Sequence, residues 1–391
     1  MKCIDYRTKT IFKEADNGYT GNGYFWESAL DIGYSGVKLY GPNLCAVFPS
    51  YAKEINRSAY IGELTTDDIL YTDLENGKTW LVGRAAQNMI QFGDTNDSIE
   101  ALCGRNRYFT PMFLVIARTG LALTMMQTRN AKYKYEPSML PVIQTGLPCR
   151  YMGDEPYIKE ALTGRHHFSI QLGNGYKHEF DFVVSPNYIK VMQQPMGAFI
   201  SASTDALWIQ DIRKFQKQNV LIADPGFNTL DTFSVLGGAI SSEESWTDYS
   251  MKRILQETSD TIYEKYHQEI PVACMQKTLE NGTFTYINRK ERKTSSIEFA
   301  DILNDASHKV FNEALDKLYD MYDSFADYRF IILTGGTGAA WAPWFTDALK
   351  NMETLSVISG YTPDGNPQYF ANVRGYYQYL KQYVSRLPIP A

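Results

Sequence analysis

The same short turn occurs twice in this chain, once in each half, and it limits the folds that the sequence can adopt. The first copy is ALDIGYSGVK at Ala29–Lys38, and the second is LIADPGFNTLD at Leu221–Asp231. In each copy an apolar run typical of a strand ends at an aspartate, Asp31 or Asp224, and a glycine follows two residues later. Glycine lets the N–H groups of a tight turn converge on an anion, and an aspartate beside them can hold Mg²⁺ through water. A single turn of this kind is more often an ordinary hairpin, but two copies in corresponding halves favour a phosphate site.

The length and charge of the chain narrow the possible functions. Its 391 residues exceed the roughly 250–300 residues of a single hydrophobic core, so we expect two domains. Hydrophobic residues make up 44% and charged residues 21%, which excludes a disordered or fibrous protein. The net charge of −6 argues against a protein that coats nucleic acid through its own basic field. The 28 tyrosines are typical of a protein with many half-buried surfaces of the kind that interfaces use.

Cysteine usage and apolar segments indicate a cytoplasmic protein. The five cysteines are well separated and form no C-x-x-C pair, so neither a zinc site nor a disulfide framework is expected. The most apolar stretch, Phe109–Met126, contains Pro111 and Arg118 and predicts a buried helix rather than a membrane span. The N-terminal residues lack the apolar region of a signal peptide. We therefore expect a soluble chain with no membrane partner.

Strand-like and helix-like segments are mixed throughout the chain, which indicates the α/β class. Strands are expected at Ala29–Ile32, Val37–Tyr40 and Cys45–Phe48, and helices at Phe109–Gln127, Pro195–Gln218 and Tyr369–Arg386. Hairpins are expected at Gly164–His178, at Asp181–Val184 with Tyr188–Met192, and in TLENGTFTYINRKERK with its turn at Asn281-Gly282.

A third glycine-rich element follows a buried strand in the second half of the chain. The sequence FIILTGGTGAA places Gly335, Gly336, Thr337 and Gly338 between the strand Phe330–Leu333 and a helix. Glycines at a strand-to-helix junction allow a ring or a phosphate to approach the backbone and the helix N-terminus. In isolation, a plain glycine-rich loop is an equally good interpretation.

Taken in order, these elements resemble the actin-like ATPases, in the superfamily that contains actin, sugar kinases and the ATPase domains of heat-shock chaperones. The closer similarity is to the bacterial plasmid-segregation actins, the ParM/StbA-like group, and it covers nearly everything after residue 28. The further segments that carry it are FPS at Phe48–Ser50, VGRAA at Val82–Ala86, TGLP at Thr145–Pro148, QQPMGA at Gln193–Ala198 and FANVRGYYQYL at Phe370–Leu380. The resemblance implies the actin-like ATPase fold, with two related ribonuclease-H-like domains and a nucleotide cleft between them.

The resemblance also assigns a role to each residue of the loops. Asp31 and Asp224 would hold Mg²⁺ through water and Gln194 would orient the attacking water, so these three are the predicted catalytic residues. The predicted nucleotide-binding residues are Gly33, Tyr34, Ser35, Gly36 and Lys38 in the first loop, Gly226, Phe227, Asn228 and Thr229 in the second, and Gly335, Gly336 and Thr337 in the adenosine motif. Gln194 could instead cap the helix that follows it.

Two residues of the second loop depart from the family's pattern. Pro225 removes one N–H donor and Phe227 crowds the turn, which weakens the case for a tight phosphate cradle and for fast hydrolysis.

The implied domains are 29–192 plus 365–391 and 193–364, preceded by an N-terminal extension of residues 1–28. The implied function is a slow ATPase, with ATP or GTP and Mg²⁺ as cofactors, that polymerises head to tail and uses hydrolysis to time disassembly. The implied partners are further copies of the chain and a DNA-binding adaptor on a plasmid centromere, with no direct contact to nucleic acid. Tyr24, Phe25 and Trp26 of the extension are expected to dock on their own domain or on a neighbour, and a disordered leader is an equally good interpretation.

Two other functions stay open at this point. A metabolite kinase of the same superfamily would use an aspartate base toward a sugar hydroxyl, and the chain shows no clear sugar-pocket motif. A nucleotide-dependent scaffold or chaperone-like ATPase would need a substrate domain or an amphipathic anchor, and neither is recognised in the sequence.

Three short motifs are interpreted as structural. Gly77-Lys78-Thr79 lacks the first glycine of a P-loop and predicts a turn. His166-His167 has no carboxylate or cysteine at ligand spacing, which favours a surface hairpin over a metal site. The basic run RKERK at 289–293 is expected to be a solvated hairpin strand rather than a DNA contact.

Overall fold

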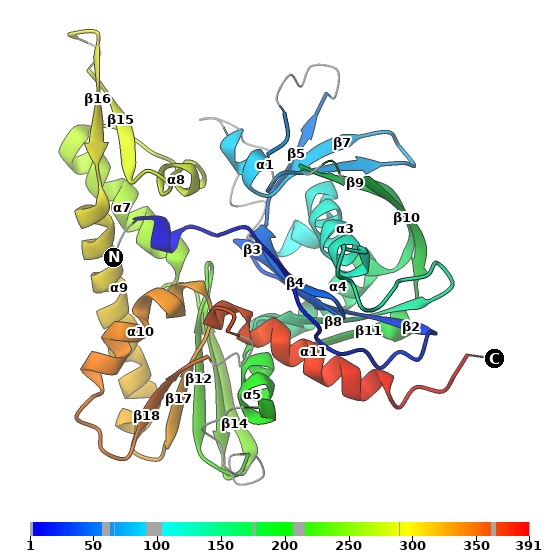
Figure 1. Cartoon of the computed structure of the whole chain (residues 1–391). Helices are drawn as coiled ribbons and strands as arrows, with labels where there is room; N and C mark the ends of the chain where they lie inside the picture. The colour runs from blue at the N-terminus through cyan, green and yellow to red at the C-terminus, as the bar shows by residue number, and fades with distance from the viewer. Residues whose placement is uncertain are drawn as a thin grey trace. The chain divides into compact units, whose positions relative to one another are not determined.

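The chain forms two compact units in the computed structural model, which describes residues 3–56, 63–65, 67–90, 104–173, 175, 177–205, 216–288, 290–360 and 365–390 (Figure 1). Unit A comprises Lys9–Met89, Glu100–Ala206 and Phe370–Ala391, and unit B comprises Met1–Thr8, Ile90–Ile99 and Leu207–Tyr369. Neither unit is a single continuous segment, because the chain passes from one to the other several times.

The central sheet of unit A has six strands in the order β1-β4-β3-β2-β8-β11. They are β1 Ile11–Glu14, β2 Phe25–Ile32, β3 Gly36–Gly41, β4 Leu44–Pro49, β8 Leu140–Leu147 and β11 Ile189–Gln193. β2, β3 and β4 form an antiparallel meander, and β8 and β11 continue from β2 in parallel. The expected strands in the region 29–48 are therefore confirmed, and β2 also includes the last residues of the predicted extension.

A second sheet of unit A has the order β10-β9-β6-β7-β5. Its strands are β5 Ala52–Ile55, β6 Ile69–Asp73, β7 Thr79–Val82, β9 Gly164–Leu172 and β10 Lys177–Val184. The apolar helix α3, Pro111–Met125, contacts strands of both sheets, so almost every one of its residues is buried. Thr110 accepts a hydrogen bond from Phe113 N at 3.2 Å, and Pro111 fits the first turn because that position needs no N–H donor.

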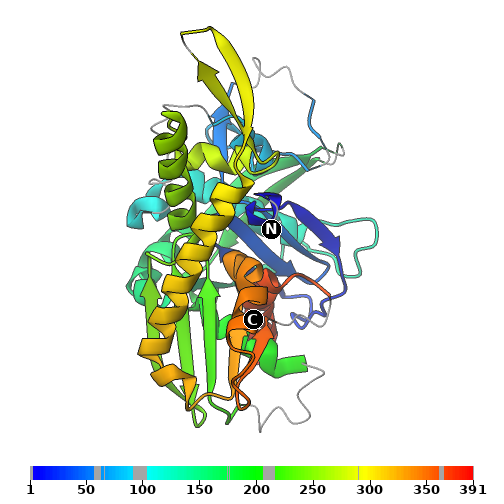
Figure 2. The same cartoon turned by 90° about the vertical axis from the view of Figure 1, so that its left-hand side faces the viewer.

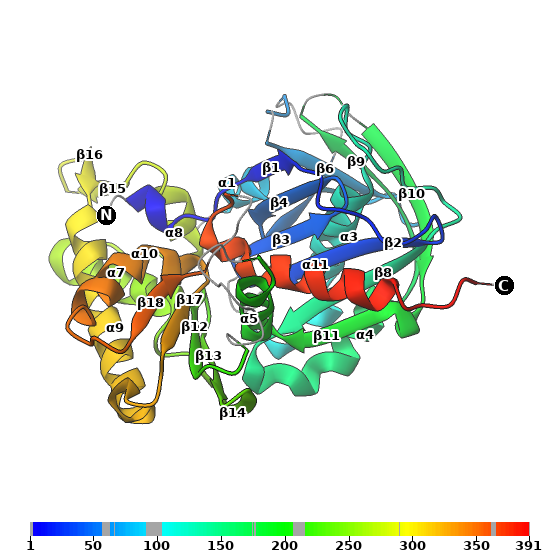
Figure 3. The same ribbon diagram turned by 60° about the horizontal axis from the view of Figure 1, so that its bottom comes forward.

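Two helices, α5 (Gln194–Asp205) and α11 (Ala371–Val384), pack together in unit A, and α11 also lies along β2, β3 and β8 (Figure 3). The remaining helices of unit A are α1 Arg84–Asn88, η3 Arg105–Phe109, η4 Cys149–Asp154, α4 Glu155–Leu162 and η5 Pro186–Tyr188. Phe25, at the start of β2, is buried with Val142, Leu380 and Val384, and Trp26 is fully buried. These two aromatic residues of the predicted extension thus dock within their own unit, whereas the expected docking of Tyr24 on its own unit is wrong, because its side chain is exposed.

Unit B repeats the topology of the central sheet of unit A. Its sheet has the order β14-β13-β12-β17-β18, with an antiparallel meander followed by two parallel strands. The strands are β12 Val220–Pro225, β13 Leu230–Leu236, β14 Ala239–Trp246, β17 Phe330–Leu333 and β18 Ser356–Ser359. The two sheets therefore share one strand arrangement, as two related ribonuclease-H-like domains require.

The helices of unit B are η1 Cys3–Tyr6, α7 Met251–Tyr266, α8 Val272–Thr278, α9 Ala300–Met321, η6 Asp323–Phe325 and α10 Gly336–Ala348, and η7 Gln368–Phe370 lies at the border of the units. β15 (Thr283–Asn288) and β16 (Lys293–Glu298) form a two-stranded hairpin that projects beyond the N-terminal end of α9 (Figure 2). No helix within the described ranges is long and apolar enough to cross a membrane.

The expected hairpin turn at Asn281-Gly282 is wrong. These residues end the segment after α8, where Gly282 N donates to Thr278 O at 2.9 Å, and the hairpin turns between Asn288 and Lys293 instead. Gly282 has a φ of +66°, so its positive φ serves the end of a helical turn rather than the hairpin.

Two further expectations also differ from the structure. Asp181–Val184 belongs to β10, which pairs with β9, whereas Tyr188–Met192 overlaps β11, which pairs with β8 in the other sheet. The helix expected over Pro195–Gln218 begins at Gln194 but does not reach Gln218, because residues 216–218 form a turn, and residues 206–215 lie outside the described part of the chain. Local alternation cannot distinguish these pairings, since the partner strand is distant in sequence.

Candidate functional site

The first Asp-Gly loop connects β2 to β3 in unit A. Asp31 is paired in register with Lys38 across the two strands, and its side chain is almost fully buried. Lys38 Nζ donates to Asp31 Oδ2 at 2.7 Å, and Gln194 Nε2 donates to Oδ1 at 3.0 Å. Three residues to which the sequence assigned separate roles therefore form one hydrogen-bonded group.

Close packing explains the glycine at position 33. A Cβ atom there would lie 2.9 Å from Gly36 O, a distance that real Cβ atoms essentially never show. Ser50 N, from the FPS segment, donates to Ser35 O at 3.0 Å and ties the loop to the end of β4. The loop is thus held in a tight turn by its own strands.

Arg107 supports the first loop and was not found from the sequence. Its guanidinium lies 4.7 Å from the centre of the Tyr34 ring, and Nη2 donates to Ile32 O at 2.6 Å. The side chain is buried, so this contact fixes the end of β2 from inside unit A. No local motif marks Arg107 as a support of the loop, because Ile32 and Tyr34 lie more than seventy positions earlier in the sequence.

Gln194 is placed by the junction between β11 and α5. β11 ends at Gln193 and α5 begins at Gln194, so the Gln194 side chain belongs to the first residue of the helix. Nε2 is used by Asp31, and Oε1 is the acceptor that could orient a water molecule. The arrangement brings the predicted water-orienting residue to the predicted magnesium-side carboxylate.

The start of α5 is fixed by its contact with α11. A Cβ atom on Gly375 would lie 1.8 Å from Gly197 O, and one on Gly197 would lie 2.3 Å from Asn372 O. The two helices are therefore in backbone contact, and Arg374 Nη1 adds hydrogen bonds of 3.1 Å to the carbonyl and hydroxyl oxygens of Ser201. This crossing accounts for the glycines of the QQPMGA and FANVRGYYQYL segments.

The second Asp-Gly loop connects β12 to β13 in unit B. Asp224 is 5% exposed and pairs in register with Asp231. Gly226 N donates to Thr229 O at 2.7 Å and closes the turn. The carbonyl groups of Gly226 and Phe227 accept from Met251 N and Lys252 N at the start of α7, at 3.1 and 2.8 Å. The carbonyls of Gly226 and Phe227 are therefore engaged within unit B, and the N–H groups of the loop other than that of Gly226 are the atoms that could face an anion.

The side chain of Phe227 packs against the hydrophobic core of unit B. The predicted crowding of the turn is correspondingly reduced. Pro225 lies beside Gly338, where a Cβ atom would be 3.2 Å from Pro225 Cδ.

The glycine-rich β17–α10 turn meets the second loop directly. β12 and β17 are parallel neighbours, so their C-terminal ends lie at the same edge of the sheet. Gly335 has a φ of +78°, and a Cβ atom there would lie 2.2 Å from Asp224 Oδ1. Thr337 Oγ1 donates to Gly226 O at 2.9 Å. The predicted adenosine motif and the second phosphate loop thus form one continuous surface in unit B.

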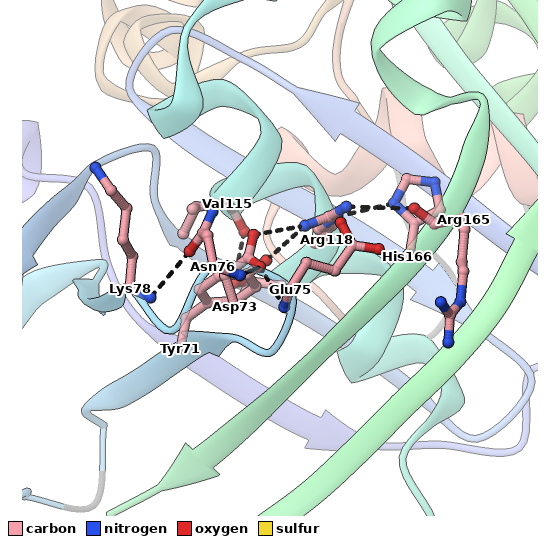
Figure 4. Close-up of polar contacts among 10 residues, drawn as sticks. Tyr71, Asp73, Glu75, Asn76, Lys78, Val115, Arg118, Arg165 and His166 are labelled. Carbon is pink, nitrogen blue, oxygen red and sulfur yellow. Dashed lines mark hydrogen bonds and ion pairs between the residues drawn. The ribbon is translucent and has the colours of Figure 1, made fainter.

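The predicted surface location of His166 is wrong. His166 is buried, and its Nδ1 accepts from Arg118 Nε at 3.0 Å while Nε2 contacts Leu162 O at 3.0 Å (Figure 4). Arg118 also donates to Tyr71 Oη and Asp73 Oδ2, at 3.0 and 3.1 Å. Burial lowers the pKa of His166 to about 4, so the ring is neutral and serves the arginine as an acceptor.

Gly77-Lys78-Thr79 lies in the turn between β6 and β7, as predicted. Asp73 Oδ1 accepts from Glu75 N and Asn76 N, and Asn76 Oδ1 accepts from Lys78 N at 2.9 Å (Figure 4). The side chains of this segment are thus used to build the turn.

Comparison with known proteins places this architecture. Residues 29–197 match the family model described as the N-terminal domain of actin-like proteins. Its fold is that of the actin-like proteins. No curated protein sequence matches the chain. The actin-like fold that the motifs predicted is confirmed by the similar solved structures, which include ParM proteins.

Three of these structures are informative, although identities of 14–17% establish only a common fold. A non-polymerisable quadruple mutant of pCBH ParM has a TM-score of 0.69 at 17% identity, over 91% of this chain and 99% of that chain. A 15-stranded ParM filament from Clostridium botulinum has a TM-score of 0.67 at 17% identity, over 92% and 99%. The archaeal actin homologue Ta0583, in complex with ADP, has a TM-score of 0.60 at 14% identity, over 92% and 100%.

Proposed function

We propose that this actin-like protein binds ATP or GTP with Mg²⁺, hydrolyses it slowly, and assembles in the cytoplasm into filaments that segregate plasmid DNA through a DNA-binding adaptor. The observation that carries the proposal is the group formed by Asp31, Lys38 and Gln194 at the first loop, together with an equivalent Asp-Gly loop at the same topological position in unit B.

The residues present fit a magnesium nucleotide. Asp31 and Asp224 supply the carboxylate oxygens that Mg²⁺ prefers as ligands, directly or through water. Gly335 lets the β17–α10 turn come close to the Asp224 carboxylate, since a Cβ atom there would lie 2.2 Å from Oδ1. Magnesium, when bound, would neutralise charge on the phosphate oxygens.

The chain's own residues would position the reactants. Lys38, 17% exposed, can carry its charge toward a phosphate while it stays within reach of Asp31. Gln194 holds Asp31 through Nε2 and would orient a water through Oε1. An amide cannot remove a proton effectively, which predicts slow turnover suited to timing the life of a polymer.

The test of the chemistry compares two neighbouring glutamines. Gln194→Ala should bind the nucleotide with nearly unchanged affinity and release phosphate at least about tenfold more slowly, because the water loses its acceptor. Gln193→Ala, which removes the same group one residue earlier, is the control. Unchanged phosphate release with weakened nucleotide binding would show that Gln194 is a helix cap or a contact residue.

Unit B carries opposite charges at its two ends, which supports head-to-tail assembly. Lys290, Arg292 and Lys293 are exposed at the turn of the β15–β16 hairpin together with Glu291, which pairs with Lys293 at 3.4 Å, so the turn keeps a net positive charge. The exposed aspartates at the C-terminal end of α9 are Asp316, Asp320, Asp323 and Asp327. The helix spans about 33 Å and the hairpin adds about 20 Å, so the two charged ends are roughly 50 Å apart (Figure 2). A contact between such ends does not close on itself and therefore builds a filament.

Charge reversal tests this contact. Lys290→Glu/Arg292→Glu and Asp316→Lys/Asp320→Lys/Asp323→Lys should each fail to sediment with nucleotide, because in each variant the two ends then carry net charge of the same sign. An equimolar mixture should sediment again, since every contact then joins opposite charges. Two variants that polymerise separately, or a mixture that stays in the supernatant when the wild type pellets, would refute the contact.

A further inference from the structure

The N-terminal segment Cys3–Arg7 is bound to unit B by three anchors, although the chain continues from it into unit A. The side chains of Cys3, Tyr6 and Arg7 are only 5%, 7% and 8% exposed. Cys3 and Tyr6 belong to the hydrophobic core of unit B. The helical turn η1 lies beside α8 and α10 (Figures 1 and 3).

Two anchors hold the base of the β15–β16 hairpin. Cys3 packs against Gly282, where a Cβ atom would lie 3.3 Å from Cys3 Sγ. Gly282 immediately precedes β15, and its carbonyl accepts from Phe299 N, immediately after β16, at 3.1 Å. Arg7 Nη1 forms a 2.6 Å ion pair with Glu280 Oε2, two residues earlier. Both contacts therefore act where the hairpin joins the rest of unit B.

The third anchor reaches α9 and α10. The turn η1, which contains Tyr6, contacts α10, and Ser307 Oγ of α9 accepts from Trp341 Nε1 of α10 at 3.1 Å. Trp341 is fully buried in α10, about one turn after the glycine-rich junction that opens this helix. The segment thus touches the hairpin base with one side and the helix of the adenosine motif with the other.

We propose that Cys3–Arg7 is a clamp that joins the base of the hairpin to α10, so that the hairpin and the β17–α10 turn move as one body. The functional role of this clamp rests on the proposed function, in which the β17–α10 turn contacts the nucleotide and the hairpin tip contacts the next subunit. Binding at the turn would then bias the position of the assembly surface, and assembly would bias nucleotide affinity by the same factor.

Hydrogen exchange in the nucleotide-free protein tests the clamp itself. Removal of residues 2–8, or Arg7→Ala, should speed exchange of the hairpin amides at 284–288 and 294–298 by about tenfold or more, because the ion pair of the buried Arg7 with the half-buried Glu280 at their base is lost. Lys9→Ala, which removes a positive charge from an exposed position two residues away, should leave exchange unchanged. Glu280→Ala should match Arg7→Ala, and the double variant should add nothing, since both remove the same pair. Unchanged hairpin exchange in both the truncated protein and Arg7→Ala would overturn the proposal.

A second arm, with MgADP as the probe, separates this proposal from the proposed function. In the wild type MgADP should slow exchange at both the β17–α10 turn and the hairpin, whereas in Arg7→Ala it should slow exchange at the turn only. An equal hairpin response in Arg7→Ala would overturn the coupling. If MgADP changes nothing at the turn of the wild type, the proposed function fails, while the nucleotide-free measurement still decides whether the clamp exists.

Discussion

Two single alanine substitutions, at the neighbouring Gly335 and Gly336, should have different effects on the stability of unit B and on its proposed nucleotide binding. At Gly335 the new Cβ atom would lie 2.2 Å from Asp224 Oδ1 and 2.6 Å from Pro225 O, in a residue whose φ is +78°. With a ψ of 166°, the residue lies in a backbone region that essentially only glycine adopts, which costs an alanine about 1–3 kcal/mol, and the enforced shift of buried backbone adds about 1–3 kcal/mol. Gly335→Ala should therefore destabilise unit B by about 3 kcal/mol.

The neighbouring substitution should do the opposite. A Cβ atom on Gly336 has no atom within 4 Å, and the residue begins α10, where alanine is favoured over glycine by up to about 1 kcal/mol. Gly336→Ala should keep or slightly raise stability. If the nucleotide approaches the backbone here, the methyl group should weaken its binding by at least about tenfold, which is about 1.4 kcal/mol.

Urea unfolding and displacement of a fluorescent ATP analogue measure the two effects. Wild-type nucleotide affinity in Gly336→Ala would show that the nucleotide does not approach this turn closely. A wild-type unfolding midpoint in Gly335→Ala would refute the packing of the turn against Asp224.

Two further predictions concern unit A. Gly375→Ala should lower the free energy of unfolding by about 3 kcal/mol, because its Cβ atom would meet Gly197 O. Gly153→Ala, at an exposed position where a Cβ atom has no atom within 4 Å, should leave it unchanged. Equal urea midpoints for the two variants would contradict the helix crossing. The pKa of His166 is about 4 in the folded protein, below its ordinary 6.5, so its neutral form adds stability above pH 6.5 that is lost as the pH falls toward 4. In His166→Asn the free energy of unfolding should therefore fall by about 3 kcal/mol less than in the wild type between pH 7 and pH 4. An equal fall in the two proteins would show that His166 is not the group responsible.

Local motifs were sufficient to find both Asp-Gly loops and the glycine-rich turn. The two Asp-Gly loops depend on contacts between residues close in sequence, such as Asp31 with Lys38 and Gly226 with Thr229. The repeated loop also predicted two related domains, because the same turn follows the first strand of the same meander in each unit. The catalytic and binding roles of these residues remain predictions.

The residues that support the loops were not predictable in the same way. Arg107 donates to Ile32 O, 75 positions away in the sequence, and Arg118 donates to His166 Nδ1, 48 positions away. The absence of a carboxylate or cysteine at ligand spacing favoured a surface hairpin for His166-His167, and only the packing of α3 between two sheets makes His166 a buried acceptor.

The sequence by itself determined the fold class, the repeated loops and the places where only glycine fits a tight turn, because these follow from periodicity and backbone geometry over a few residues. The tertiary structure alone decided which distant groups meet: Gln194 with Asp31, Gly197 with Gly375, and Cys3 with Gly282. Such contacts depend on how strands pair and helices cross, and many sequence patterns are compatible with each one. The energies of these contacts come from burial and, at the glycines, from the close approach that a missing side chain allows. Both can be assessed only in the folded chain.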